Sequence, residues 1–396
     1  MLWNFGDGPN DGAEPQGTLV ADHFGDLYGT TRIGGNNQSG VVFKLHRQPD
    51  GTWSETIIHR FCSTIVNDVC VDGAQPQAGL VFDSSGNLYG TTLEGGASCS
   101  FNSGGCGTAF ELSPPSGGAG EWTETILYNF CQTVQGVCLD GNYPTSQLTF
   151  DAMGNLYGTT EQGGSGHWTQ NNGAGTVFEL SPGANGWTHT VLYNFCSLGS
   201  GSACPDGAKP FSGVTFDSAG NLYGTTENGG GASGLAYGAV YELSPGSNGW
   251  TQRVLYSFYV PAEPGAQVSF DSTGDLYSTT KLGQVGFGSV FKLSTNHTVR
   301  SFQFNSVNGN QPYAGVIVDP LNNGLYGTTY EANDAGNVFS IGSGGKFSVL
   351  YAFCSQPACA DGAGPAAGLL LKGGNLYGTT TIGGANNQGV VFEITQ

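Results

Sequence analysis

The feature that most constrains the fold of this 396-residue chain is a five-residue phrase, Leu-Tyr-Gly-Thr-Thr, that returns along almost the whole sequence. Six copies are identical, and the remaining one, which begins at Leu276, has Ser in place of Gly. The copies begin at residues 27, 88, 156, 222, 276, 325 and 376. Similarity that returns at intervals of tens of residues is the sequence signature of a repeat architecture, in which one supersecondary unit is copied along the chain.

Each repeat contains four short segments that are rich in aromatic and β-branched residues, and Gly, Asp, Asn and Pro clusters separate them. In the third repeat these segments are Leu148–Asp151, Asn155–Thr160, Thr176–Leu180 and Trp187–Phe195. No stretch has an apolar period near 3.6 residues, so we predict essentially no helix. The 68 glycines fit this interpretation, because tight turns between strands often require a positive φ.

Four antiparallel strands in each of seven repeats predict an all-β fold, a seven-bladed β-propeller in a single domain over residues 1–396. The expected blades span about 17–61, 79–131, 147–195, 213–258, 266–304, 315–353, and 368–396 together with 2–6. The last repeat has no fourth segment of its own. Leu2–Phe5 resembles the segment that ends the other repeats, as in Leu127–Phe130, so we expect the N-terminal strand to complete the last blade.

The repeated phrases also have expected structural roles. The Asp-x-x-Gly-Asn segments are turns, in which Asp caps its own turn and Gly takes a positive φ. Strand alternation places the Tyr of Leu-Tyr-Gly-Thr-Thr on the face opposite to the Gly. One packing hypothesis is that this Tyr ring lies over the Gly of an adjacent blade.

Charge narrows the possible partners. The formal net charge is −19 with 11 Lys and Arg residues, which argues against nucleic acid and against anionic membrane surfaces. Solubility of an exported protein is the simpler explanation of the acidity. No apolar run is long enough for a membrane span, and we expect a monomer.

The ten cysteines form five close pairs, and four of the pairs occupy equivalent places in their repeats. The pairs are Cys62/Cys70, Cys99/Cys106, Cys131/Cys138, Cys196/Cys204 and Cys354/Cys359. Pairing within each loop is the economical interpretation, since zinc would need four converging ligands. Disulfides indicate an extracellular or periplasmic protein, and we expect an export signal that has been removed.

Tandem "GNLYGTT…GG…G-x-VFELSP" units resemble the GloVer-type repeat family of exported bacterial proteins, and the resemblance extends from Leu2 to Ile394. It implies an exported, β-propeller-like protein that is often anchored to the cell surface. It implies no catalytic residues.

Variable residues follow the constant Thr-Thr and are predicted to lie, with the irregular loops, on one face of the propeller. Glu161 and Glu227 occupy equivalent places in consecutive blades, where a carboxylate pair about 6.5–9.5 Å apart would suit inverting glycoside hydrolysis. Further candidates for substrate contacts at this position or the next are Arg32, Lys281, Tyr330, Glu94 and Glu331. The alternative is that these residues are rim charges that pair in solvent.

The loop of the third repeat adds His167, a possible acid or base, and Trp168, which could stack on a sugar ring or cover its own loop. The other histidines do not cluster, so a histidine metal site has little support. The Asp-Gly turns could suggest calcium, but ordinary turn chemistry is the stronger interpretation, and we expect no cofactor. These turns begin at Asp11, Asp72, Asp140, Asp206 and Asp361.

Two function classes remain after these exclusions. The first is a binding module that recognises a polysaccharide or a surface partner through the loop face. The second is a carbohydrate-active hydrolase or lyase that uses Glu161 and Glu227. Repeated loops naturally give repeated weak sites, and no set of residues specifies a reaction, so we favour binding.

Overall fold

The computed structural model describes residues 1–96, 105–117, 122–132, 138–166, 173–199, 203–231, 237–331 and 335–395. The fold is all-β, a seven-bladed propeller with antiparallel strands in each blade, as predicted. Within the described residues the helical segments are two short 3₁₀ turns, η1 (Asn36–Gln38) and η3 (Pro357–Cys359). The chain divides into two compact units. Unit 1 comprises Met1–Phe130, Tyr143–Leu148 and Ala352–Gln396, and unit 2 comprises Cys131–Asn142 and Thr149–Tyr351.

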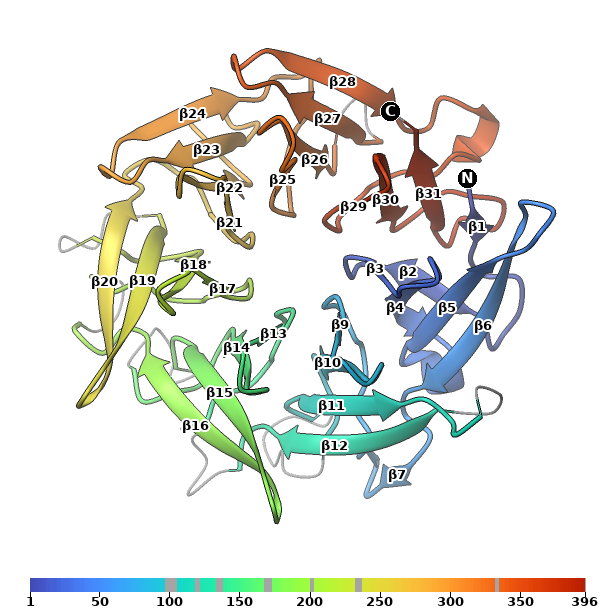
Figure 1. Cartoon of the computed structure of the whole chain (residues 1–396), viewed down its shortest axis with the longest axis horizontal. Helices are drawn as coiled ribbons and strands as arrows, with labels where there is room; N and C mark the ends of the chain where they lie inside the picture. Colours follow the sequence, from blue (N-terminus) through green and yellow to red (C-terminus); the bar gives the residue numbers. More distant parts are fainter. Residues whose placement is uncertain are drawn as a thin grey trace. The chain divides into compact units, whose positions relative to one another are not determined.

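Unit 1 contains three of the sheets (Figure 1). The first sheet consists of β2 (Gly12–Pro15), β3 (Val20–Ala21), β4 (Leu27–Gly34), β5 (Val41–Arg47) and β6 (Trp53–Arg60). The second consists of β9 (Val81–Phe82), β10 (Leu88–Thr92), β11 (Thr108–Ser113) and β12 (Thr123–Asn129). The last consists of β29 (Leu370–Lys372), β30 (Asn375–Thr380), β31 (Val390–Ile394) and β1 (Trp3–Asn4). The first sheet gains a fifth strand because β2 also pairs with the long β4.

Unit 2 contains the other four sheets. The third sheet of the chain consists of β13 (Thr149–Phe150), β14 (Leu156–Thr160), β15 (Thr176–Gly183) and β16 (Gly186–Asn194). The fourth consists of β17 (Thr215–Phe216), β18 (Leu222–Thr226), β19 (Ala239–Gly246) and β20 (Gly249–Ser257). The fifth consists of β21 (Ser269–Phe270), β22 (Leu276–Thr280), β23 (Ser289–Leu293) and β24 (Val299–Gln303). The sixth consists of β25 (Ile317–Val318), β26 (Leu325–Thr329), β27 (Asn337–Ile341) and β28 (Phe347–Ala352).

The N-terminal strand completes the last sheet, which confirms the sequence prediction. β1 pairs antiparallel with β31, with Trp3 opposite Val391, and the two strands lie side by side in Figure 1. Phe5 follows this strand and is fully buried. Its ring packs edge to face against Phe43 of the first sheet, with 5.0 Å between the ring centroids.

The Phe that follows the outermost strand makes the same contact elsewhere, so it is a repeated device that joins one sheet to the next. Each contact pairs this Phe with an aromatic ring on the third strand of the following sheet, at 5.0–5.2 Å. The pairs are Phe61–Phe110, Phe195–Tyr241, Phe258–Phe291, Phe304–Phe339 and Phe353–Phe392. Edge-to-face aromatic pairs of this kind add to the stabilisation from buried apolar area.

The Tyr and Gly of the repeated phrase have separate partners, and the hypothesis that the Tyr covers a neighbouring Gly is wrong. The Tyr28 hydroxyl donates to Asp22 Oδ2 at 3.2 Å, and its ring packs edge to face on Phe82 of the next sheet. Gly29 instead lies against Phe43 of the neighbouring strand β5 in the same sheet, and a Cβ on Gly29 would lie 2.6 Å from Cζ of Phe43. Glycine at this position therefore lets the Phe43 ring on the third strand lie against the second strand.

The first Thr of the phrase holds one sheet to the next. Thr225 Oγ1 donates to the backbone carbonyl of Ala266, 3.0 Å away in the segment that leads into the next sheet. Equivalent bonds run from Thr30 to Ala78, Thr91 to Ser146, Thr159 to Ser212 and Thr279 to Ala314. The second Thr stays within its own strand, as when Thr226 donates to the carbonyl of Asn228. Thr225 and Thr226 are buried, and both of their hydroxyls have hydrogen-bond partners.

Candidate functional site

Two variable positions lie together at the end of the second strand in several of the sheets. One is the residue after Thr-Thr. The other is the residue directly before the Pro of the turn that precedes the sheet, and in five repeats this turn reads Asp-Gly-x-x-Pro. The carbonyl of this turn residue accepts the backbone N–H of the residue after Thr-Thr. Bonds of this kind join Leu93 to Gln75, Glu227 to Lys209, Lys281 to Glu263, Tyr330 to Gln311 and Thr381 to Gly364. The frame is constant and the side chains differ, so this position is where the repeats can carry specific contacts.

The turn residue in this frame has a left-handed backbone in every repeat. Its φ is between 50° and 64° at Glu14, Gln75, Tyr143, Lys209, Glu263, Gln311 and Gly364. Six of these seven residues are not glycine, and a positive φ in other residues is uncommon and costs energy. The side chains that are retained in spite of this cost are candidates for function.

In unit 1 the frame holds an ion pair and an amide–carboxylate hydrogen bond. Arg32 Nη1 lies 2.9 Å from Glu14 Oε2, and Gln75 Nε2 donates to Glu94 Oε2 at 2.9 Å. Burial raises the pKa of the Glu94 carboxyl, and the positive charge of Arg32 opposes this shift. Two of the residues predicted from the sequence, Arg32 and Glu94, therefore have specific partners from the turns.

In unit 2 both members of the predicted carboxylate pair accept a hydrogen bond from a lysine. Lys209 Nζ lies 3.1 Å from Glu161 Oε1, and Lys281 Nζ donates to Glu227 Oε1. The side chains of Glu227 and Lys281 are 18% and 16% exposed. Lys281, predicted as a substrate contact, thus lies directly beside Glu227.

Aromatic rings surround this lysine. Lys281 Nζ lies 5.0 Å from the ring centroid of Phe211 and 5.3 Å from that of Tyr313. The Tyr313 ring in turn packs edge to face on Tyr330, with centroids 5.0 Å apart. Burial raises the pKa of the Tyr313 phenol, so this hydroxyl stays protonated at neutral pH. We call Glu227, Lys281, Phe211, Tyr313 and Tyr330 the unit 2 cluster.

Glu331 lies next to the cluster in sequence and has amide partners. Its Oε2 accepts hydrogen bonds from Asn310 Nδ2 at 3.0 Å and from Gln311 Nε2 at 3.3 Å. The candidates His167 and Trp168 lie outside the described residues.

Sequence reasoning missed the partners Glu14, Gln75, Lys209, Phe211 and Tyr313. The signal for Glu14, Gln75 and Lys209 was their variable position directly before the Pro of an Asp-Gly-x-x-Pro turn, whereas Phe211 and Tyr313 directly follow the Pro of their turns.

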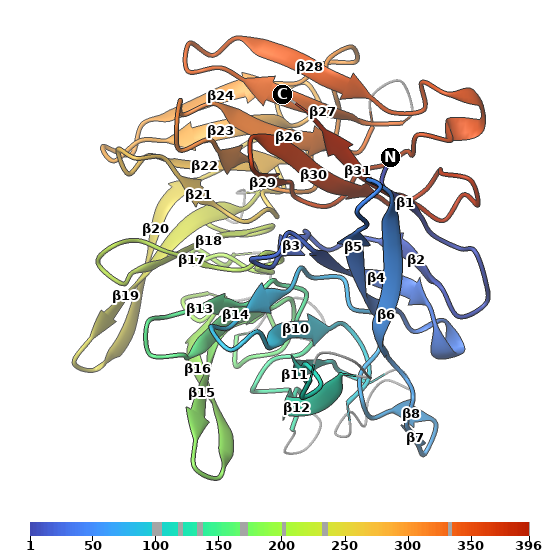
Figure 2. The same cartoon turned by 45° about the vertical axis from the view of Figure 1, so that its right-hand side comes forward.

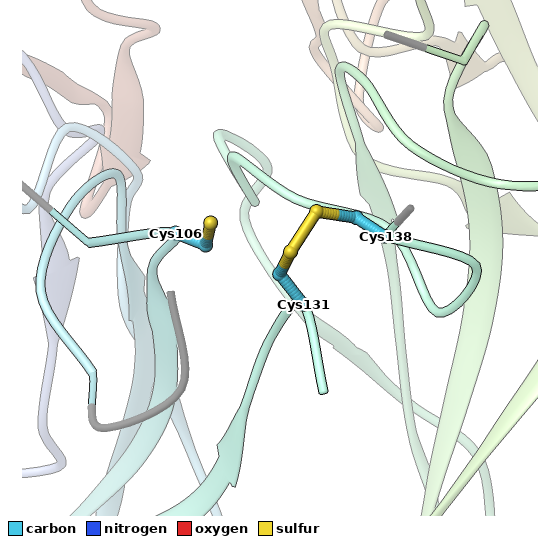
Figure 3. A group of neighbouring side chains, drawn as sticks. All are labelled: Cys106, Cys131 and Cys138. Atoms are coloured by element: carbon cyan, nitrogen blue, oxygen red, sulfur yellow. A yellow bond between two sulfur atoms is a disulfide. The ribbon is translucent and has the colours of Figure 1, made fainter. Parts of the chain in front are cut away.

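Four of the expected disulfides are present: Cys62–Cys70, Cys131–Cys138, Cys196–Cys204 and Cys354–Cys359. Figure 3 shows the second of these. Cys106, also drawn there, is disulfide-bonded, and its expected partner Cys99 lies outside the described residues. The first disulfide closes a segment that contains the small hairpin of β7 (Ile65–Val66) and β8 (Val69–Cys70), visible in Figure 2. The disulfides indicate an oxidising environment, extracellular or periplasmic.

The Asp-Gly turns close the same loops through hydrogen bonds. Asp206 is buried, and its Oδ2 accepts from the backbone N–H of Ser197 at 2.8 Å and from its hydroxyl at 3.0 Å. Asp361 accepts from Ser355 in the same way. The Asp side chain of these turns therefore fixes the first residues after each loop-opening Cys.

The sequence pattern of the Gloeobacter/Verrucomicrobia repeat matches residues 1–170 and 167–392. The chain belongs to this repeat family. The resemblance seen in the sequence is thereby confirmed. No curated protein sequence matches the chain.

Two solved structures share the fold of this family member at low identity. One is a candidate 6-phosphogluconolactonase of Bacteroides uniformis, with a TM-score of 0.52, 16% identity and coverage of 84% of this chain and 83% of that one. The other is PorZ of Porphyromonas gingivalis, a surface component of the type-IX secretion system. It has a TM-score of 0.51, 15% identity and coverage of 98% of this chain, which spans about half (48%) of PorZ. Similarity at this level concerns the fold alone.

Unit 1 also contains a cavity of about 810 Å³ at the turns between strands, away from the Thr-Thr positions. Its lining includes Tyr28, Phe82, Trp122, Lys44 and His46. The sequence does not indicate this cavity, because the turns that border it are the most regular part of each repeat.

Among the described residues, no helix is long and apolar enough to cross a lipid bilayer.

Proposed function

We propose that the protein is an exported, monomeric binding module that recognises a neutral polysaccharide through the unit 2 cluster. The observation that supports this most is the arrangement of rings and charges around Lys281. Its Nζ lies within 5.3 Å of the ring centroids of Phe211 and Tyr313, and it donates to Glu227. Sugar rings bind to surfaces that combine an aromatic face with a few fixed polar groups.

The charge of the chain favours a neutral glycan over an anionic one. A net charge of −19 repels polyanions, and the lysine that could attract them is already paired with Glu227. The second carboxylate oxygen of Glu227 and the phenols of Tyr313 and Tyr330 are the hydrogen-bonding groups proposed for sugar hydroxyls. Trp168 is proposed as a further stacking residue.

The test is binding of soluble β-glucan and xylan, with polygalacturonate as the anionic control. Tyr313→Ala and Tyr330→Ala should each weaken binding of the neutral glycan by about 10-fold, because one stacking face is lost. Phe24→Ala removes a ring that is 78% exposed on a turn between strands and should leave binding unchanged. Equal affinity of wild type and both Tyr variants would contradict the proposal, as would preferential binding of polygalacturonate.

A second proposal is hydrolysis or lysis of the same polysaccharide by Glu161 and Glu227, with His167 as a further acid or base. It is favoured by the equivalent placement of the two carboxylates, which follow β14 and β18, the second strands of two consecutive sheets of unit 2. Release of reducing ends or unsaturated products should then be abolished in Glu161→Gln and Glu227→Gln. Asp50→Asn, which changes a carboxylate on the turn between β5 and β6, is the control and should leave product release unchanged. Binding without any product in the wild type would leave the first proposal and exclude this one.

A further inference from the structure

Three groups that commonly ligate metals converge where the outer strands of two sheets of unit 1 meet a disulfide-closed segment. His59 belongs to β6, Glu124 to β12, and Asp72 to the turn after Cys70. Their ligand atoms all lie within 4.8 Å of one another. His59 Nε2 is 3.5 Å from Glu124 Oε1, and these side chains are 11% and 12% exposed.

The two closest atoms have no other partner. His59 Nε2 and Glu124 Oε1 are buried and make no hydrogen bond to any described residue. Such atoms are unusual in folded proteins, because burial without a partner loses the hydrogen bonds made to water. Asp72 also retains coordinating capacity. Its Oδ2 accepts two short bonds from Ser63, whereas its Oδ1 has a contact of 3.4 Å with the backbone N–H of Thr64.

An equivalent frame in unit 2 shows what this position looks like when it is satisfied by hydrogen bonds alone. There the His is replaced by Tyr193, whose hydroxyl donates to Asp206 Oδ2 at 2.8 Å. The Glu is replaced by Gln252, whose amide donates to the backbone carbonyl of the same Asp206 at 3.0 Å. The unit 1 frame has an imidazole and a carboxylate in place of the Tyr hydroxyl and the Gln amide.

A third copy, also in unit 1, has the two carboxylates but no imidazole. Glu55 occupies the place of Glu124, and the negative charge of Asp11 in the preceding turn acts on it. Trp3 lies two residues before the buried Phe5, where the first frame has His59 before Phe61. An indole nitrogen is a donor without a lone pair for a metal. Of these three copies, the His59 copy alone combines an imidazole with two carboxylates.

We propose that His59, Asp72 and Glu124 bind one divalent transition-metal ion, for which Zn²⁺ is the best match. Zinc binds imidazole nitrogen and carboxylate oxygen at about 2.0–2.2 Å, so two ligands in a tetrahedral site lie about 3.3–3.6 Å apart. The 3.5 Å between His59 Nε2 and Glu124 Oε1 agrees with this geometry. Calcium prefers six to eight oxygen ligands, so an imidazole disfavours it.

The ion would join the first and second sheets to the segment that follows the Cys62–Cys70 disulfide. A water molecule would take the fourth position. The role is structural, and it is independent of the unit 2 cluster and of the proposed function.

The test is metal binding by the full chain after dialysis against chelator, followed by titration with ZnCl₂ in a calorimeter. The wild type should bind one Zn²⁺ per chain and melt at a higher temperature when zinc is present. The double variant His59→Tyr with Glu124→Gln installs the residues of the unit 2 frame, so it should fold. It should bind zinc at least about 100-fold more weakly and show no zinc-dependent melting shift.

Two further variants keep the result interpretable. Glu124→Gln alone keeps His59 in place and should also weaken zinc binding. It serves as the test if the double variant does not fold. His46→Ala removes a more exposed His that pairs with Asp26, and it should leave binding unchanged. The proposal is overturned if the wild type binds no zinc, if the Glu124 variant binds it as tightly as the wild type, or if Ca²⁺ binds in preference to Zn²⁺.

Discussion

Replacing Phe5 by Ala tests whether the N-terminal segment carries part of the stability of the protein. Phe5 is fully buried, and its ring packs on Phe43 at 5.0 Å. Removing a buried Phe side chain loses its transfer free energy and leaves a cavity, which together cost about 3–5 kcal/mol. The backbone bond from the Phe5 N–H to the carbonyl of Gly389 is kept in the variant, so the loss measures side-chain packing.

The assay is urea unfolding followed by tryptophan fluorescence, with the free energy of unfolding compared at similar m-values. Phe304→Ala removes the equivalent ring of another sheet, which is also almost completely buried, and should cost a similar amount. Phe24→Ala removes a ring that is 78% exposed and should change stability by less than about 0.5 kcal/mol. If Phe5→Ala behaves like Phe24→Ala while Phe304→Ala is strongly destabilised, the N-terminal segment does not contribute packing in solution and the reasoning is refuted.

Three other predictions concern the devices that repeat along the chain. Cys196→Ala with Cys204→Ala opens a loop of sequence separation 8 and should lower the free energy of unfolding by about 2–2.5 kcal/mol, and this difference from the wild type should disappear when both proteins are fully reduced. Thr225→Val removes the donor to the Ala266 carbonyl and should cost about 1–3 kcal/mol in urea unfolding, whereas an unchanged value would mean that water replaces the hydroxyl. Burial, reinforced by the charge of Asp11, raises the pKa of Glu55 to about 9 from an ordinary 4.5. The folded state therefore holds a proton that the unfolded chain releases, and this contribution is complete below pH 4.5 and is lost as the pH rises towards 9. Glu55→Gln should reduce the fall in stability between pH 5 and 8.5, by up to about 1.4 kcal/mol per pH unit, and parallel pH profiles for the two proteins would contradict this.

The strand order could be predicted from the sequence because each repeat presents the same local signals. The Asp-x-x-Gly-Asn turns and the alternation in Leu-Tyr-Gly-Thr-Thr act within a few residues, and seven copies of one pattern leave few alternatives. The match between Leu2–Phe5 and the segments that end other repeats was enough to predict the pairing with β31. The partner of the Gly was predicted wrongly because strand alternation gives the face of a side chain but not which ring fills it.

The candidate site was harder to predict because its partners come from different repeats. The position after Thr-Thr could be found in the sequence, but the ion pairs of Glu161 with Lys209 and of Glu227 with Lys281 join residues about 50 positions apart. The group of His59, Asp72 and Glu124 was missed for a related reason. A search for clustered histidines does not detect one imidazole that meets two carboxylates from neighbouring strands and turns.

The pairing of β1 with β31 has a consequence for how the chain reaches its native state. The β1 segment finds its partner strand late in folding, because β31 (Val390–Ile394) lies far along the same chain. Until then one sheet keeps an open edge and Phe5 has no place to be buried, which delays folding and favours exchange of the first strand between two copies. Pairing of β1 with β31 of its own chain therefore competes with pairing of β1 with β31 of a second copy.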